Sequence, residues 1–138
     1  MRVSQRSDYA LRALVLLAMQ PEGTYVAAGD LADRLMLPRR FVEQQITALA
    51  RAGIVVCRRG AGGGCALTGP AEGFTVHDVV SALEGVVIDV PRQQDSAVAD
   101  VWRRLAVSAD DYLASVTIAD LAEGQRGIDA RSAPVYHI

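Results

Sequence analysis

The chain has 138 residues, with fourteen arginines, no lysine, sixteen acidic residues and a formal net charge of −2. This length favours a single domain that buries roughly two-thirds of its unfolded surface, so it can fold without a metal or a disulfide. About half of the residues are apolar, which excludes global disorder. The slightly acidic balance, taken alone, argues against a general nucleic-acid coat.

The longest apolar run, from Tyr9 to Met19, contains Arg12 and is shorter than the roughly 20 residues that span a bilayer. No small-residue cleavage site follows it, so we interpret it as a buried helix and not as a signal peptide. The two cysteines, Cys57 and Cys65, are too few for a secreted disulfide scaffold. The sequence therefore predicts a cytoplasmic protein without a membrane segment.

Two helices are predicted before residue 36. The first begins at a serine cap, Ser4 or Ser7, and runs to about Gln20. It is apolar nearly all round, so other elements must surround it. A second, shorter helix covers about residues 28–35.

A third helix is predicted between Pro38 and Gly53, because proline suits the first helical position and glycine suits the left-handed cap. Its two sides differ in polarity. The predicted inward residues are Val42, Ile46, Leu49 and Ala50, and the predicted outward residues are Arg39, Arg40, Glu43, Gln44, Thr47 and Arg51. Such a helix can dock on the protein by one side and offer side chains to base edges by the other.

A β-hairpin is predicted next, with strands at 54–57 and 65–68 around the glycine-rich segment 58–64. Helix, short helix, turn, longer helix and hairpin is the order of a winged helix-turn-helix. Arg58 and Arg59 precede the tip, which has little side-chain bulk and could enter a minor groove, where arginine is favoured.

Thr75 and Asp78 have the spacing of a capping box, which predicts a fourth helix that ends at Gly85. Residues 86–94 mix strand-like and loop-like side chains, and we predict that they form a linker.

A long helix is predicted over about residues 95–122, followed by a loose tail over 124–138. Apolar residues recur along it every seven positions, as in helices that pack against a partner helix. The predicted dimerisation residues are Val98, Val101, Trp102, Leu105, Ala109, Tyr112, Leu113 and Val116. The expected fold is mainly α with a small β-hairpin wing: a winged helix-turn-helix domain over 1–85, then a linker and C-terminal dimerisation helix over 86–123.

The predicted DNA-binding residues fall into three groups. Those expected in the major groove are Arg40, Glu43, Gln44 and Thr47; those of the wing are Arg58, Arg59 and Gly60, with Arg59 in the minor groove; those expected at phosphates are Arg39 and Arg51.

The charge distribution agrees with this assignment. Residues 1–64 hold nine arginines and five acidic residues, a balance of +4, whereas residues 65–138 hold five and eleven, a balance of −6. The acidic half therefore masks a basic half, and phosphate neutralisation depends only on the local charge of the docking face.

The stretch from Arg39 to Pro70 resembles the Rrf2 family of bacterial transcription regulators, through its FVEQ, ARAGIV and RGAGGG segments. The opening SDYALRAL, the FTV, DVV and LEG segments of the fourth helix, and the later WRRL and TIADL are also similar to that family. The resemblance covers about residues 1–123. It implies a homodimer that binds a partly palindromic operator, with the long helices crossing between subunits. We therefore predict a sequence-specific DNA-binding regulator that acts as a repressor.

Some members of that family hold an iron–sulfur cluster through three cysteines between the fourth and the long helix. The corresponding segment here, Val86 to Ala99, contains neither cysteine nor histidine, so we predict no cluster of that kind, no metal site and no cofactor. Asp8, which stands near the place of an acidic ligand in some members, is interpreted as a partner of the helix dipole. Met36 replaces the usual turn glycine, and Pro38 replaces a common capping serine.

Cys57 and Cys65 lie on opposite arms of the predicted wing, four residues either side of Ala61. Directly paired strand positions can come within reach of a disulfide, which would make the wing a redox switch. The alternative is that two small, soft side chains simply fill strand positions.

Two alternatives belong to other function classes. A winged-helix module could act by docking to an enzyme or another regulator, in which case it need not bind DNA with the steep salt dependence of phosphate contacts. No set of nucleophile, base and orienting group is visible, so we predict that the chain is not an enzyme. The expected effector is a small molecule or a protein.

Overall fold

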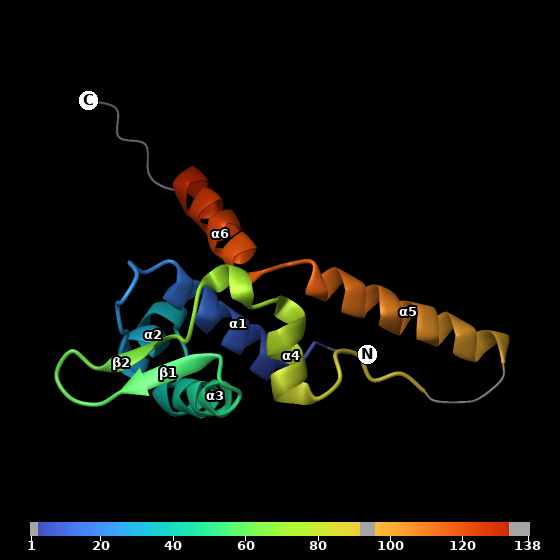
Figure 1. The fold of residues 1–138 in the computed structure, drawn as a ribbon, viewed down its shortest axis with the longest axis horizontal. Coiled ribbons are helices and arrows are strands. Elements are labelled where there is room, and N and C mark those ends of the chain that lie inside the picture. The colour runs from blue at the N-terminus through green and yellow to red at the C-terminus, as the bar shows by residue number, and fades with distance from the viewer. Residues whose placement is uncertain (1–2, 92–95, 133–138) are drawn as a thin grey trace.

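The computed structural model describes residues 3–91 and 96–132, and its fold is mainly helical with a small hairpin, as predicted (Figure 1). The helices and strands are α1 (Gln5–Ala18), α2 (Ala28–Leu35), α3 (Arg39–Arg51), β1 (Val55–Arg58), β2 (Gly64–Leu67), the 3-10 turn η1 (Ala71–Gly73), α4 (Val76–Glu84), α5 (Ala97–Ala114) and α6 (Ile118–Ser132). The predicted bounds of the first four helices and of the strands are correct to within about two residues.

Polar side chains cap the helices where the sequence predicted. The Ser4 hydroxyl accepts a hydrogen bond from the Ser7 backbone N–H at 3.1 Å, which satisfies one of the unpaired donors at the start of α1. Thr75 and Asp78 form the reciprocal capping box of α4. Pro38 is the N-cap of α3, so this helix begins one residue later than predicted.

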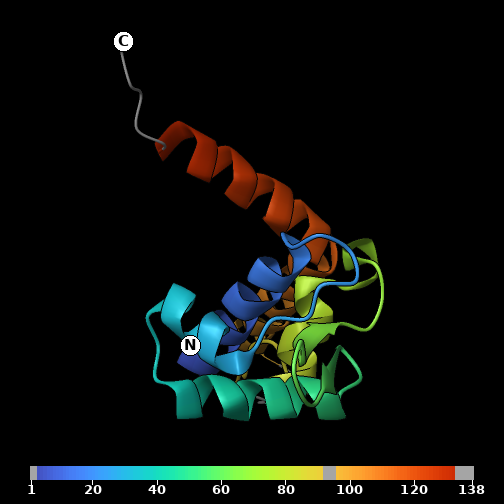
Figure 2. The same ribbon diagram turned by 90° about the vertical axis from the view of Figure 1, so that its left-hand side faces the viewer.

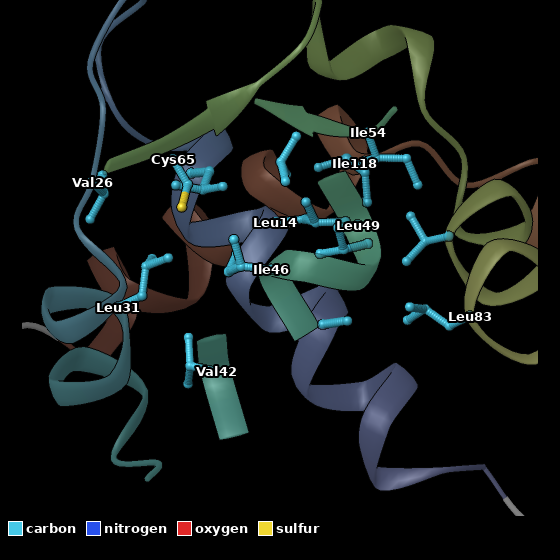
Figure 3. Packing of buried hydrophobic residues seen from close by; sticks show 14 of the residues in the cluster. Leu14, Val26, Leu31, Val42, Ile46, Leu49, Ile54, Cys65, Leu83 and Ile118 are labelled. Atoms are coloured by element: carbon cyan, nitrogen blue, oxygen red, sulfur yellow. The ribbon is translucent and has the colours of Figure 1, made fainter. Parts of the chain in front are cut away.

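The core forms where α1 meets the other helices. Leu14 of α1, Leu31 of α2 and Leu49 of α3 are fully buried, and Ile118 of α6 joins them (Figure 3). Burying each of these side chains stabilises the fold by about 1.5–3 kcal/mol. Because α1 contacts α2, α3, α4 and α6, it is surrounded as its apolar sequence predicts. This core holds α3 in a fixed orientation.

The hairpin is attached to the helical domain through Val26, in the segment that precedes α2. Val55 pairs with Leu67 and Cys57 with Cys65, and Val26 forms an isolated bridge to Cys65. At Gly64 a Cβ atom would lie 2.4 Å from the Val26 carbonyl carbon, so only glycine fits there. The wing is therefore fastened at its base to the chain that precedes α2.

The prediction of one long helix followed by a loose tail is wrong. α5 ends at Ala114, and a separate helix, α6, begins at Ile118 and continues to Ser132. The break arises because Thr117 and Asp120 form a second capping box, with backbone-to-side-chain hydrogen bonds of 3.0 Å in both directions. The predicted helix start at residue 95 and the predicted tail beyond 132 lie outside the described residues.

The two capping boxes lie side by side and join α4 to α6. Thr75 and Thr117 form an isolated bridge, the Val76 N–H donates to the Val116 C=O at 2.9 Å, and the Ile118 N–H donates to the Phe74 C=O at 2.8 Å. This junction turns the chain, so that α5 projects from one side of the domain while α6 returns against α1 (Figure 1).

No helix in the described part of the chain is both long enough and apolar enough to cross a membrane.

Candidate nucleic-acid interface

The six residues predicted on the outer side of α3 are all exposed: Arg39, Arg40, Glu43, Gln44, Thr47 and Arg51. The opposite side buries Val42, Ile46 and Leu49, as predicted. Figure 2 shows α3 along the lower edge of the molecule, with the hairpin next to its C-terminal end. The helix thus presents a polar side outward and is held by an apolar side, as a recognition helix requires.

Two residues of α3 differ from the predicted faces. Ala50, predicted inward, is exposed, and Gln45, which was assigned to neither side, is 6% exposed. The Gln45 side-chain carbonyl accepts a hydrogen bond from Arg6 Nε at 3.2 Å. Helical spacing from Val42 and Leu49 places position 45 on the buried side, but a polar glutamine side chain is not expected in a core from the sequence alone. The Arg6 contact provides the partner that a buried amide needs.

Part of the polar face is already engaged within the helix. Arg39 Nε lies 2.8 Å from a Glu43 carboxylate oxygen, and the Thr47 hydroxyl donates to the Glu43 backbone C=O at 2.9 Å. Arg40, Gln44 and Arg51, by contrast, make no side-chain hydrogen bond or ion pair within the described residues. They are the side chains most directly available to an external ligand.

The two wing arginines differ in the same way. The Arg58 guanidinium lies over the Tyr25 ring, 4.3 Å from its centroid, a cation–π contact that fixes its position. Arg59 is exposed and forms no ion pair within the described parts of the chain. Tyr25 was missed because nothing in its local sequence indicates that it faces the wing.

Glycines shape the wing tip for two different reasons. Gly60 and Gly62 have φ values of 93° and 74°, which L side chains rarely adopt, and space is open around both. At Gly63 a Cβ atom would meet the Arg58 carbonyl oxygen at 2.3 Å. The glycine run is therefore required by the turn itself, and it leaves a thin tip beside the two arginines.

Met36, in the turn that leads to α3, has a φ of 58° and is 90% exposed. The left-handed conformation that glycine favours is thus present at the position where the sequence departs from the usual turn glycine. The turn geometry of the helix-turn-helix is kept, with methionine in a strained backbone conformation.

The predicted dimerisation residues lie on α5 with one exception. Three of them are largely exposed, with Val98 at 62%, Val101 at 57% and Tyr112 at 67%. Leu105 is exposed to 38%, and Trp102, Ala109 and Leu113 are half-buried. Val116 lies after the helix, where its C=O is bonded to α4, so its predicted place on the dimerisation helix is wrong. Ala99 is the one buried residue described in α5.

Cys57 and Cys65 are opposite each other in the hairpin, with 3.5 Å between their Sγ atoms, and both are unbridged thiols. Asp8 lies in the first turn of α1, as predicted, and its carboxylate is 2.8 Å from Arg12 Nε.

Comparison with known proteins identifies relatives over most of the chain. The family described as "Rrf2: Iron-dependent Transcriptional regulator" matches residues 3–124. A Mycobacterium tuberculosis protein named as an HTH-type transcriptional regulator is 34% identical over 133 residues, which cover 90% of this chain and 83% of that protein. The HTH-type transcriptional regulator CymR of Bacillus subtilis is 28% identical over 124 residues, 88% of this chain and 90% of its own.

Solved structures agree with these matches. The structure of Bacillus subtilis CymR, called the global cysteine regulator, superposes with a TM-score of 0.81 at 28% identity and covers 89% of this chain and 97% of that one. The IscR of T. potens superposes with a TM-score of 0.78 at 27% identity and covers 100% of this chain and 94% of the other.

The family description names iron, but the residues present do not fit a cluster held by three cysteines of one chain. The chain has two cysteines, and both lie in the wing hairpin. Within the described residues no group of three histidine, cysteine or acidic side chains is placed to hold a metal ion. With a family match over residues 3–124 and structural agreement along the whole domain, this chain belongs to the Rrf2 family and is a transcription regulator, not an enzyme.

Proposed function

We propose that this regulator binds a specific DNA operator as a homodimer, with α3 in the major groove and the wing at the flanking minor groove. The observation that carries the proposal is the exposed polar stripe of α3, backed by a fully buried apolar side and continued by the wing arginines. Its membership of a family of transcription regulators supports the same conclusion.

The side chains of α3 provide complementary ways to read bases. Arg40 can bind guanine through two hydrogen bonds, and Gln44 can do the same with adenine. Neither side chain has a partner within the described residues that would have to be displaced. Glu43 could accept a hydrogen bond from a cytosine amino group once Arg39, its present partner, moves to a phosphate. Arg51, in the last turn, is assigned to a phosphate.

The wing is assigned a second, simpler task. Arg59 is exposed beside a tip of glycines and fits a narrow minor groove, whereas Arg58 is held against Tyr25 and supports the base of the wing. Gly60 lets the backbone come close to the DNA because it adds no side chain.

The apolar residues of α5 provide the reason for a homodimer. Val98, Val101 and Tyr112 expose more than half of their surface on a helix that projects from the domain. Packing two such helices together would bury these side chains and place two copies of α3 about one DNA turn apart, roughly 34 Å, on an operator with inverted half-sites.

We further propose that the protein acts in the cytoplasm and that its binding to the operator represses transcription, because a dimer on a promoter competes with the polymerase for the same DNA.

We also propose that the protein binds DNA without a three-cysteine iron–sulfur cluster, since the chain lacks the third cysteine. A visible absorbance spectrum of protein purified without oxygen tests this point, because an iron–sulfur cluster would absorb strongly there.

The experiment that tests the proposed function is selection of bound duplexes from a random pool, followed by titration of the selected duplex at several salt concentrations. We expect an enriched sequence with two inverted half-sites and an affinity that falls steeply with salt. Failure to enrich any sequence, together with salt-independent or absent DNA binding, would favour a module that docks to another protein.

A further inference from the structure

Cys57 and Cys65 form a particular kind of cross-strand pair. They are direct partners in the register of β1 and β2. The Cys65 N–H donates a hydrogen bond to the Val26 C=O at 2.8 Å, and the Cys65 C=O accepts one from the Val26 N–H at 2.9 Å. In a β-strand, the N–H and C=O of one residue point toward the same neighbouring strand. Because both groups of Cys65 face Val26, Cys65 makes no backbone hydrogen bond to Cys57. The two cysteines are therefore a non-hydrogen-bonded pair of an antiparallel ladder.

This pair type already has the backbone spacing of a disulfide. Non-hydrogen-bonded partners have Cα atoms about 4.5 Å apart, within the range of about 4.4–6.8 Å found for disulfides. The Sγ atoms, now 3.5 Å apart, must approach by about 1.5 Å to form the bond. Side-chain rotation with a small shift of the strands is sufficient, so the hairpin needs no refolding.

The two thiols have different environments. Cys65 is 4% exposed, and burial, followed by its contact with Cys57, raises the pKa of its thiol to about 12. Cys57 is on the solvent side of the pair. Because oxidants attack an accessible thiolate, and the raised pKa keeps Cys65 protonated, Cys57 is the thiol that reacts first. Cys65 resolves the product because its sulfur is held 3.5 Å from the oxidised one.

We propose that Cys57 and Cys65 form a reversible disulfide when a hydroperoxide oxidises the wing, and that this disulfide weakens DNA binding. In the first step the Cys57 sulfur takes one oxygen from the hydroperoxide, giving a sulfenic acid and an alcohol, or water from hydrogen peroxide. In the second the Cys65 sulfur bonds to the Cys57 sulfur, and the sulfenic oxygen leaves as water with the Cys65 proton. A dithiol reductant restores both thiols by exchange.

The effect on DNA rests on the proposed function and follows from the neighbours of the pair. Arg58 and Arg59 follow Cys57 directly, and Arg58 is held over Tyr25, the residue before the Cys65 partner Val26. The Gly63 position is packed against the Arg58 carbonyl oxygen. A shift of Cys57 is therefore passed through close backbone contacts to the arginines at the tip. The bond would hold Arg59 away from the position in which it binds DNA.

The test uses the full chain, reduced and then treated with hydrogen peroxide. Alkylation of remaining thiols and intact mass would follow the cysteines, and titration of the selected duplex would follow affinity. We expect each wild-type chain to lose both thiols and two hydrogen atoms and to run as a single chain under denaturing conditions without reductant. DNA binding should be about tenfold weaker for each half-site, the effect of losing one good contact in each wing. Dithiothreitol should reverse all of these changes.

Cys57→Ser is the main control because its side chain is exposed and the substitution leaves the core intact. We expect this variant to bind DNA like the reduced wild type and to keep that affinity after peroxide. Cys65→Ala checks the resolving thiol and should stop at a Cys57 sulfenic acid or its further oxidation products.

Two kinds of result would overturn the proposal. Retention of both thiols, oxidation of only one, or bonds between chains would overturn the intramolecular disulfide. An oxidised wild type that binds DNA with unchanged affinity, or a Cys57→Ser variant that loses affinity to the same extent, would overturn its regulatory effect. If the reduced protein binds no DNA at all, the proposed function and the regulatory effect both fail, while the thiol and mass measurements still decide whether the disulfide forms.

Discussion

α3 and α5 both leave one side uncovered, but the chemistry of the two uncovered sides is opposite. The uncovered side of α3 is polar and carries arginine, glutamine, glutamate and threonine, whereas that of α5 exposes Val98, Val101, Leu105 and Tyr112. A solvated polar side is stable in water by itself, while a row of exposed apolar side chains marks a surface that another molecule covers. This difference is the basis on which we propose DNA as the ligand of α3 and a second copy of the chain as the partner of α5.

The two helices also differ in how firmly they are attached to the domain. α3 buries Val42, Ile46 and Leu49 in the domain core, so the orientation of its polar side is fixed before any ligand binds. α5 fully buries only Ala99 among its described residues. It packs in part against α4, where His77 Nε2 lies 3.3 Å from an Asp110 carboxylate oxygen. We expect α3 to be preorganised in the monomer and α5 to be ordered by dimerisation.

The largest effect is expected from Leu105→Asp on α5. A carboxylate buried between two apolar helices loses its hydration without gaining a partner, so the dimer dissociation constant should rise by about a hundredfold or more. Sedimentation equilibrium would measure it. Arg103→Asp introduces the same side chain two residues away, on the other side of the helix, and should leave the dimer intact. Equal loss in both variants would remove the distinction between the two sides of α5.

A smaller effect is expected from Arg59→Ala in the wing. Loss of the minor-groove contact should weaken operator binding by about tenfold for each half-site and lower the salt slope by about one unit for each bound chain. The matched control is Arg131→Ala, which removes an exposed arginine from the last turn of α6, far from the proposed DNA face. Wild-type affinity in Arg59→Ala, measured by fluorescence anisotropy, would contradict the assignment of this residue.

Glu43→Ala should change sequence choice more than affinity. The substitution removes a proposed base contact and also releases Arg39 from its 2.8 Å ion pair, so the lost contact is offset by a freed cation. We expect discrimination at one operator position to fall by about 1 kcal/mol, read from binding to single-base variants. Glu123→Ala, which breaks the exposed ion pair with Arg126 in α6, should change neither property. A uniform loss of affinity over all operator variants would instead indicate that Glu43 acts by positioning Arg39 at a phosphate.

The smallest effect is expected from Met36→Gly. Met36 is apolar and 90% exposed, like the exposed residues of α5, but we do not assign it to a contact surface. Its backbone has a φ of 58°, a strained conformation for methionine that glycine adopts without strain. We expect an increase in stability of about 0.5–1 kcal/mol, seen as a rise of about 2–4 °C in thermal unfolding, with no change in the dimer. A destabilised variant would show that the methionine side chain makes a contact that outweighs the strain.

The elements that the sequence predicted well are those with strong local signals. Ser4, Pro38, Gly53 and the Thr75–Asp78 pair marked the ends of helices, and the observed ends lie within about two residues of them. The exposed side of α3 was also correct, since alternation of polar and apolar residues at helical spacing follows directly from burial of one side. The Cys57–Cys65 register followed from the symmetry of the hairpin.

The errors came from features that depend on distant contacts. Apolar spacing continues through Val116 and Ile118, which masked the break before α6, although Thr117 and Asp120 repeat the capping arrangement already recognised at Thr75. Gly124 and Gly127 lower helix propensity, but packing of α6 on α1 overrides it. Gln45 and Tyr25 took roles set by Arg6 and Arg58, which are far from them in sequence.

The central claim is that α3 binds DNA and α5 binds a second copy of the chain. The measurement that tests it most directly is the mass of the complex between the reduced protein and a selected duplex that carries two half-sites. Sedimentation equilibrium or native mass spectrometry would give it. We predict two chains on each duplex for the wild type, because each copy of α3 reads one half-site and α5 joins the copies. A complex with a single chain bound at full affinity, or a stable dimer that binds no duplex, would contradict the assignment of DNA to α3 and of a second copy to α5.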